Sequence, residues 1–365
     1  MMLFTQFIFS RLRSQLAKSV FARSGFSIAA TAGLIGLLIL PINALNAAEI
    51  NIYSARQPFL IKAILEDFSE QTGIVTNIVY TSSNLVKRLE LEGDRSAADL
   101  VLTSDVAPLY QMASLGLTQS VDSQILQRNI PARYRDPQGL WFGLTSRARV
   151  IYAAKNRVDP NQLTHYEALM DKEWQGRICS RSAKHNYMLS LISSIILARG
   201  EQFAEQWLLG VKANLARKPQ GNDRAQVKAI SEGVCDIALV NSYYFGKMIT
   251  NKRKPEQITW AKSVNLIFPN QLGRGSHMNI SGIALTQNAP NKDNAIALME
   301  YLSSDRAQFL YAQQNHEFPV RAKTEHSDLL KQYMPKFKPD QMNLAAIAQQ
   351  HGKALKLIQK VNFDN

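Results

Sequence analysis

Apolar positions after residue 48 recur with a period of two in some segments and with helical spacing in others. In the first part of the chain, strands are expected at 49–54, where apolar positions alternate, at 75–80, and at 98–102, which is a short apolar segment. Helical spacing predicts helices at 58–72, 83–92 and 106–115. Repeated strand–helix units predict an α/β protein with a mostly parallel sheet and helices on both of its faces.

The pattern changes after residue 140. Segment 141–154 predicts a strand long enough to pass from one domain to another, and a second strand–helix series follows it. The further strands expected are 177–179, 235–240 and 279–285, and the further helices are 188–199, 201–216 and 223–232, the last with Asp223 at its capping position.

Two α/β lobes joined by crossing strands are typical of a hinged binding protein of the Venus-flytrap kind. We expect residues 49–147 and 280–365 to form the first lobe and residues 148–279 the second. Ligands of open α/β sheets lie at the carboxyl ends of strands. In a two-lobed protein those ends face each other across a cleft, which closes by a hinge motion.

The N-terminus predicts export from the cytoplasm. Residues 1–24 carry four cations and no acidic residue, an apolar run covers 26–40, and small residues occupy 44–48. This order is typical of a secretory signal peptide, which we place at 1–48 with cleavage after Ala47 or Ala48. The alternative is an uncleaved membrane anchor, although the run is shorter than the roughly 20 residues that span a bilayer. We therefore expect a periplasmic protein.

Composition narrows the classes of function. Hydrophobic residues make up 46% of the chain and charged residues 19%, which excludes a disordered or fibrous protein. The formal net charge is +13, and the cations are dispersed apart from Lys252-Arg253-Lys254, which we interpret as a solvated loop. Export argues against a nucleic-acid partner, so the charge favours an anionic ligand or surface. We expect a monomer.

The chain has two cysteines, Cys179 and Cys235. An even count in an exported chain predicts one disulfide bond between them. The alternative is two buried free thiols. A metal site made of cysteines alone is excluded by their number.

Motifs for catalysis are weak. No G-x-S-x-G occurs, and Gly273-Arg274-Gly275 lacks the third glycine of a dinucleotide-binding loop. The six histidines show no metal-ligand spacing, and the adjacent pair His316-Glu317 is interpreted as a loop contact.

The tyrosines carry the most specific chemistry. Tyr243 and Tyr244 follow an apolar strand directly, and Tyr187 lies at another strand-to-helix connection. Phenolate is a hard, anionic oxygen donor, which suits a hard and highly charged cation. A trivalent ion favours deprotonation of a phenol, whose ordinary pKa is about 10. The alternative is that these tyrosines only pack.

Several segments together resemble the bacterial periplasmic ferric-ion-binding proteins, the solute receptors of iron ABC transporters. The resemblance covers about 51–320 and is carried by Asn51-Ile52-Tyr53-Ser54-Ala55-Arg56, Ala97-Ala98-Asp99-Leu100, Trp141-Phe142-Gly143-Leu144-Thr145-Ser146-Arg147, Pro219-Gln220-Gly221-Asn222-Asp223, Asn241-Ser242-Tyr243-Tyr244, Phe268-Pro269-Asn270-Gln271 and Asn279-Ile280-Ser281-Gly282.

The resemblance implies a two-lobed fold of the transferrin-like periplasmic type II. It also implies Fe(III) bound by three tyrosinates, because the tandem tyrosine pair of the family falls on Tyr243 and Tyr244 and its third tyrosine on Tyr187. The function implied is that of a periplasmic, non-enzymatic receptor that delivers ferric ion to an inner-membrane ABC permease.

One departure concerns the first lobe. Many relatives carry a His-Tyr pair of iron ligands where this chain has Gln57 and Pro58. Other relatives carry an acidic ligand after the third strand, where this chain has Asp105 as a possible substitute. Three phenolates fill half of an octahedron, so we expect a synergistic carbonate or small carboxylate, held by Arg147 and Gln57. Arg56 and Arg149 are weaker candidates for the same role.

Two other functions remain open from the sequence. One is a receptor for a small organic or phosphorylated anion, with the tyrosines as packing residues. The other is an exported hydrolase, for which His185 and Asp223 are the nearby candidates.

Overall fold

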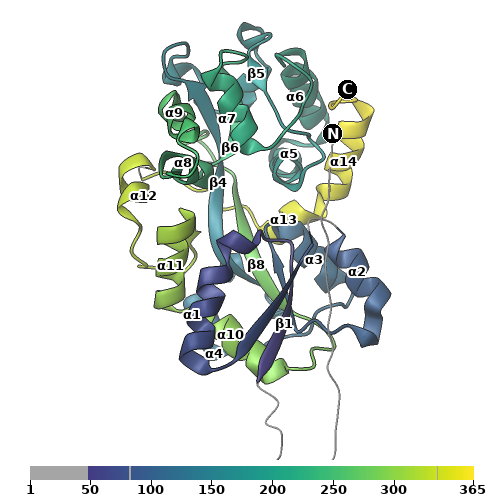
Figure 1. The fold of residues 1–365 in the computed structure, drawn as a ribbon. Helices are drawn as coiled ribbons and strands as arrows, with labels where there is room; N and C mark the ends of the chain where they lie inside the picture. Colours follow the sequence, from purple (N-terminus) through teal and green to yellow (C-terminus); the bar gives the residue numbers. More distant parts are fainter. Residues whose placement is uncertain (1–47, 82–83, 335) are drawn as a thin grey trace, which may run out of the picture. The chain divides into compact units, whose positions relative to one another are not determined.

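The computed structural model describes residues 48–81, 84–334 and 336–365 (Figure 1). The predicted signal peptide lies outside these residues, apart from Ala48. No helix among the described residues is both long enough and apolar enough to cross a membrane.

The strands form one path of hydrogen-bonded neighbours, in the order β2-β1-β3-β8-β4-β6-β5, with β7 and β9 also paired to β4. Their bounds are β1 Glu49–Ser54, β2 Val75–Tyr80, β3 Leu100–Thr103, β4 Phe142–Ala154, β5 Ile178–Cys179, β6 Ile237–Asn241, β7 Val264–Ile267, β8 Met278–Leu285 and β9 Phe318–Pro319. The positions of β1, β2 and β4 agree closely with the sequence pattern.

Strand β4 belongs to both lobes. All of its 13 residues are buried. Its first part, from Phe142 to Ala148, pairs with β8, whereas Arg149 to Ala153 pairs with β6. In Figure 1, β4 and β8 run between the group of elements around β1 and the group around β6. The fold is therefore the two-lobed type II architecture with crossing strands.

The expected mostly parallel sheet is wrong. Among the described strands, only the β1–β2, β1–β3 and β5–β6 pairs are parallel. The pairs β3–β8, β4–β8, β4–β6, β4–β7 and β4–β9 are antiparallel. The hydrophobic period identifies a strand but not its direction, and β8 returns from the second lobe against the direction of β4.

Helices cover the strands. The helices around β1, β3 and β8 are α1 Lys62–Thr72, α2 Leu85–Glu92, α3 Val106–Ser114, α4 Gln124–Asn129, α10 Lys292–Leu302, α11 Asp305–Asn315 and α13 Leu344–Gln349. The others are α5 Asn186–Arg199, α6 Glu201–Ala213, α7 Asp223–Ser231, α8 Tyr243–Ile249, α9 Glu256–Lys262, α12 Asp328–Tyr333 and α14 His351–Lys360. The cap of α7 is Asn222, whose side chain accepts from Ala225 N, and not Asp223 as expected.

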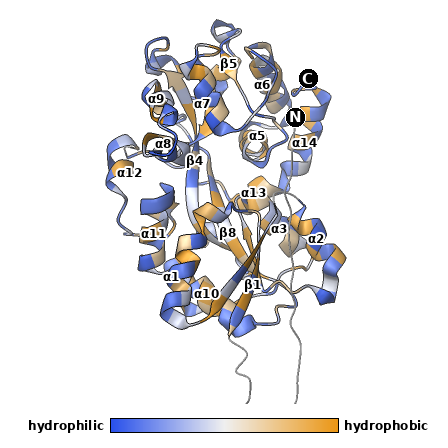
Figure 2. Ribbon diagram, viewed as in Figure 1, coloured by the Kyte–Doolittle hydropathy of each residue, from blue (hydrophilic) through white to orange (hydrophobic). Residues whose placement is uncertain are grey.

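The molecule has two hydrophobic cores, one in each lobe. One contains Ile52, Leu102 and Ile283, and the other contains Val150 and Val240. The second core also includes Leu330, Leu357 and Ile358, so α12 and α14 pack with the lobe that carries β6. Helix α14 alternates between hydrophilic and hydrophobic colours in Figure 2, as an amphipathic helix on a core does.

The predicted disulfide is confirmed. Cys179 at the end of β5 is bonded to Cys235, just before β6, across 56 residues of sequence. Both residues are buried. The bond ties together the strands that precede the helices carrying Tyr187 and Tyr243.

Candidate metal centre

A cavity of about 350 Å³ lies where the two lobes meet. Residues at or just after the ends of β1, β2 and β3 line one side. Residues at or near the beginnings of α5, α7 and α8, and Arg181 after β5, line the other. The first group contributes Ala55, Arg56, Gln57, Phe59, Leu60, Tyr80 and Ser104, and the second contributes Arg181, His185, Asn186, Tyr187, Asn222, Arg224, Tyr243, Tyr244 and Lys247.

The cavity brings together the three tyrosines singled out from the sequence. The hydroxyl oxygens of Tyr187 and Tyr243 are 3.4 Å apart, and the rings of Tyr243 and Tyr244 are stacked with centroids 4.3 Å apart. Tyr187 lies in the first turn of α5, and Tyr243 begins α8. Three phenols from two helices therefore present oxygen atoms to one space.

Burial holds the phenols of Tyr243 and Tyr244 in their protonated form. The pKa of Tyr243 is raised well above its ordinary value by desolvation and by the neighbouring phenols of Tyr187 and Tyr244. Desolvation also raises the pKa of Tyr244, and Tyr187 adds to that effect. A bound cation must supply the charge that stabilises these oxygens as phenolates.

Guanidinium groups surround the tyrosines. Arg147, Arg149 and Arg181 lie with Cζ 5.7, 5.9 and 5.1 Å from the ring centroid of Tyr187. Arg224 lies 5.5 Å from the ring of Tyr244. The cavity is thus rich in positive charge and in phenol oxygens, a setting that favours an anionic group beside the rings.

Asp223 fixes two of these cations. Its buried carboxylate accepts from Arg149 Nη1 at 2.6 Å and from Arg181 Nη1 at 2.8 Å. Burial raises the pKa of Asp223, but the two guanidinium charges outweigh it and the net pKa is lowered. Asp223 therefore orients arginines and has no free carboxylate for use as a catalytic base.

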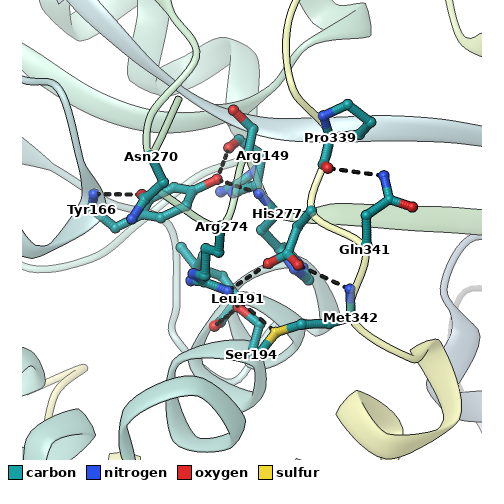
Figure 3. Close-up of polar contacts among 12 residues, drawn as sticks. Arg149, Tyr166, Leu191, Ser194, Asn270, Arg274, His277, Pro339, Gln341 and Met342 are labelled. Atoms are coloured by element: carbon teal, nitrogen blue, oxygen red, sulfur yellow. Dashed lines mark hydrogen bonds and ion pairs between the residues drawn. The ribbon is translucent and has the colours of Figure 1, made fainter. Parts of the chain in front are cut away.

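The backbone of Arg149 is anchored where β4 leaves β8 (Figure 3). The Tyr166 hydroxyl donates to the carbonyl oxygen of Arg149 and accepts from His277 N. Arg274, which is labelled in the same figure, donates to Ser194 Oγ. It also donates to the carboxylate of Asp340. The two contacts of Tyr166 hold the middle of β4, which carries Arg149, against the residue that precedes β8.

The two residues expected to hold an anion have different surroundings. Gln57 lines the cavity, is exposed, and donates its side-chain amide to the hydroxyl of Tyr80. Arg147 is buried, donates to Ser281 Oγ at 2.9 Å, and does not line the cavity. Its Nε and Nη2 are buried without a protein partner.

The remaining candidates from the sequence, Asp105 and His185, already have hydrogen-bond partners within the protein. Asp105 caps α3 and accepts from Ser190 Oγ and from Asn279 Nδ2, outside the cavity lining. His185 lines the cavity and accepts the backbone N–H of Tyr187 at its Nδ1. Burial and the charge of Arg181 lower the pKa of His185 to about 3, so its imidazole is neutral.

Sequence reasoning missed Tyr80, Arg181, Arg224 and Lys247 as lining residues. Tyr80 ends β2 and brings a fourth phenol to the cavity, from the lobe opposite Tyr243. The signal was present, because Tyr80 is the last residue of a predicted strand and Tyr243 lies just after another. Arg181 also lies in the connection just after a strand.

The donor set differs from that of most protein metal sites. No group of three His, Cys, Asp or Glu residues that could hold a metal ion occurs among the residues that the structure describes. The candidate metal-ligand atoms that cluster in this cavity are phenol oxygens.

The fold and the cavity are those of a solute-binding protein. The family model described as bacterial extracellular solute-binding protein matches residues 96–342, and the chain belongs to this family.

Among individual relatives, iron uptake protein A1 of Synechocystis sp. is 42% identical over 275 residues, which cover 75% of this chain and 76% of that protein. The crystal structure of apo ferric ion-binding protein A from Pasteurella haemolytica has a TM-score of 0.83 and 45% identity, covering 87% of this chain and 99% of that one. A Trichodesmium protein in complex with iron and citrate has a TM-score of 0.81 and 40% identity, covering 87% and 100%. The resemblance to ferric-ion-binding periplasmic proteins is thus confirmed.

Proposed function

We propose that this protein is a periplasmic receptor for Fe(III) that binds the ion through the phenolates of Tyr187, Tyr243 and Tyr244. The observation that carries the proposal is the meeting of these three phenols in one cavity between the lobes. The names of the relatives from Synechocystis and Pasteurella support iron as the cargo. The role is transport and not catalysis.

Charge explains why a trivalent cation suits the site. Three phenolates neutralise three positive charges and fill half of an octahedral coordination sphere, and hard oxygen donors favour a hard cation. Fe(II) carries one charge fewer and is softer, so reduction weakens the binding. Protonation of the phenols weakens it in the same way.

A synergistic anion completes the coordination sphere in this proposal. Carbonate or a small carboxylate supplies oxygen donors, and a Trichodesmium relative was solved with iron and citrate. Gln57 lines the cavity and serves as one partner of the anion, with Arg147 behind Tyr187 as a charge at longer range. The lining residues Arg56, Arg181 and Arg224 are better placed than Arg147 for direct contact.

Delivery follows from the two lobes. The tyrosines of the second lobe capture the ion, the first lobe closes over it with the anion, and an inner-membrane ABC permease takes up the ion from the closed form. The predicted signal peptide supports a periplasmic location. We expect the receptor to act as a monomer, with no nucleic-acid partner.

A visible-absorbance titration tests the proposal. Purified protein is titrated with chelated Fe(III), with and without bicarbonate, because charge transfer from phenolate to Fe(III) absorbs visible light. The expected result is a saturable band at one ion per chain. Absence of the band with every anion tried would contradict the proposal.

A second candidate is a receptor for a small organic or phosphorylated anion. The observation that favours it is the set of cations that line the cavity, namely Arg56, Arg181, Arg224 and Lys247. Under this alternative, the metal-free protein binds the anion tightly and added Fe(III) changes neither its affinity nor the colour. Calorimetric titration of citrate and phosphate with and without Fe(III) separates the two functions.

A further inference from the structure

Glu317 is an acidic residue in the core of the molecule, at the point where β9 approaches β4. Its side chain is 2% exposed. The next residues, Phe318 and Pro319, pair with Ser146 and Thr145 of β4. Glu317 thus belongs to the crossing region between the lobes and does not line the cavity.

The partner of Glu317 is the cavity residue Arg56. Oε1 of Glu317 accepts from Arg56 Nη1 at 3.3 Å, and Oε2 accepts from Arg56 Nη2. Thr145 Oγ1 donates to the same Oε2 at 3.1 Å. The contact is bidentate, a geometry that fixes the plane of a guanidinium as well as its position.

Arg56 keeps one edge of its guanidinium free. Of its five N–H groups, Glu317 engages one on Nη1 and one on Nη2, and Ser281 Oγ accepts another from Nη1. The Nε–H group has no protein partner although it is buried. The groups left over are Nε–H and the second N–H of Nη2, which together form the other bidentate edge.

Glu317 is itself fixed by its chain neighbours. Two residues before it, Asn315 donates to the carbonyl oxygen of Leu60 in the cavity wall and accepts from Lys247 Nζ. Lys247 lies on α8, the helix that Tyr243 begins. The segment that carries Glu317 is therefore attached both to the cavity wall of the first lobe and to α8. Through Glu317, these attachments also fix the position of Arg56.

We propose that Glu317 is a positioning residue that presents the free edge of Arg56 to a planar oxyanion, carbonate or a carboxylate, bound beside Fe(III). This inference rests on the proposed function and adds to it a preference for planar oxyanions over tetrahedral ones such as phosphate. A planar anion matches the two parallel N–H groups of a fixed guanidinium edge. Without Glu317 the long Arg56 side chain is free to adopt other rotamers. Its Nε–H and Nη2–H groups then no longer point toward the anion.

The test measures anion dependence in the full protein. Protein loaded with Fe(III) is freed of chelator, and the phenolate–Fe(III) band is followed as bicarbonate is added, and separately as phosphate is added. In the unaltered protein, the band is expected to need an anion and to form at lower concentrations of bicarbonate than of phosphate. In Glu317→Gln, the half-saturating bicarbonate concentration is expected to rise at least tenfold and the preference over phosphate to shrink.

Further variants separate positioning from a structural role. The band at saturating bicarbonate is expected to keep its wavelength in Glu317→Gln, because the phenolates are unchanged, and Glu317→Asp is expected to restore part of the affinity for bicarbonate. Glu325→Gln, which removes an exposed acid of the same region, serves as the control and is expected to match the unaltered protein. Should Glu317→Gln lack the native near-ultraviolet circular dichroism, Arg56→Lys replaces it, with the same tenfold rise expected.

Three outcomes would overturn the inference. The first is an unchanged bicarbonate dependence in a folded Glu317→Gln or Arg56→Lys protein, which would leave Glu317 a structural ion-pair partner only. The second is an unaltered protein whose band forms fully without any anion. The third is no band in the unaltered protein under any condition, and this outcome alone would overturn the proposed function as well.

Discussion

The hydroxyl oxygen of Tyr187 lies 3.4 Å from that of Tyr243, although 56 residues separate the two in the chain. Parallel pairing of β5 with β6 explains the meeting, since each tyrosine lies shortly after one of these strands. The disulfide between Cys179 and Cys235 ties the same two strands. The second lobe thus builds the tyrosine cluster on covalently connected strands.

Removal of one phenol oxygen from the cluster is expected to cost most of the iron affinity. Tyr187→Phe and Tyr243→Phe each delete a donor and keep the ring. The affinity for Fe(III) should fall by more than the roughly 10- to 100-fold typical of changes outside the direct ligands. The visible band and a competition titration with citrate measure this. Tyr110→Phe, away from the cavity, is the control, and equal affinities in all three variants would contradict the tyrosinate site.

Iron binding is expected to release protons. The pKa of Tyr243 and that of Tyr244 lie above their ordinary value because both side chains are desolvated, so both phenols are protonated at neutral pH. Coordination as phenolates frees at least two protons per ion from this pair, and the affinity for Fe(III) should therefore rise with pH. A titration in weakly buffered solution with a pH indicator counts the protons. Release of fewer than two would show that one of the two tyrosines does not bind the ion.

The sequence was informative where short local patterns decide the structure. Strand β1, strand β2 and helix α3 follow directly from hydrophobic period, and the disulfide follows from the cysteine count and export. The direction of the strands could not be predicted from the sequence. The antiparallel pairing of β8 with β4 depends on contacts between segments that are far apart in the chain. The burial of Arg147 and the bidentate contact between Glu317 and Arg56 depend on the same distant packing.

Acid is expected to weaken the fold through His185. Burial, and next the charge of Arg181, lower the pKa of its imidazole to about 3, whereas an unfolded histidine has a pKa of about 6.5. The unfolded chain therefore binds a proton that the native protein does not between these two values. This contribution to stability is complete above pH 6.5 and is progressively lost as the pH falls toward 3.

Urea unfolding at pH 7.5, 6.0 and 5.0 measures this dependence. His185→Asn keeps an acceptor suited to a helix N-terminus and removes the titrating group. The free energy of unfolding of this variant should decline less with falling pH than that of the unaltered protein. His165→Asn, at an exposed position, should leave the slope unchanged. Identical slopes in all three proteins would contradict the role of His185.

Loss of the disulfide is expected to lower stability without removing the cavity. Closure of a loop of 56 residues restricts the unfolded chain, an effect of about 4 kcal/mol on the chain-entropy model. Cys179→Ser/Cys235→Ser should show this loss in urea unfolding, and so should the unaltered protein unfolded with reductant. Because both sulfurs are buried, reductant alone should act slowly on the folded protein. A loss below 1 kcal/mol in both experiments would contradict the prediction.

Helix α8 packs closely against His316 at Gly246, so a larger residue at position 246 is expected to destabilise the protein. A Cβ at Gly246 would lie 2.4 Å from His316 Cγ, so Gly246→Ala must displace either the helix or the imidazole. Alanine favours a helix over glycine by up to about 1 kcal/mol, whereas overpacking in a core costs roughly 1–3 kcal/mol. The cost of overpacking exceeds the gain in helix propensity, so Gly246→Ala should unfold at a lower temperature than the unaltered protein.

The same displacement should reach the metal centre, because Tyr243 and Tyr244 begin the helix that Gly246 belongs to. Gly246→Ala is therefore expected to weaken Fe(III) binding as well as the fold. Gly352→Ala in α14 is the matched control, since a Cβ there meets no atom within 4 Å and the substitution should raise the melting temperature. A higher melting temperature in both variants, with iron affinity unchanged, would mean that α8 does not depend on its contact with His316.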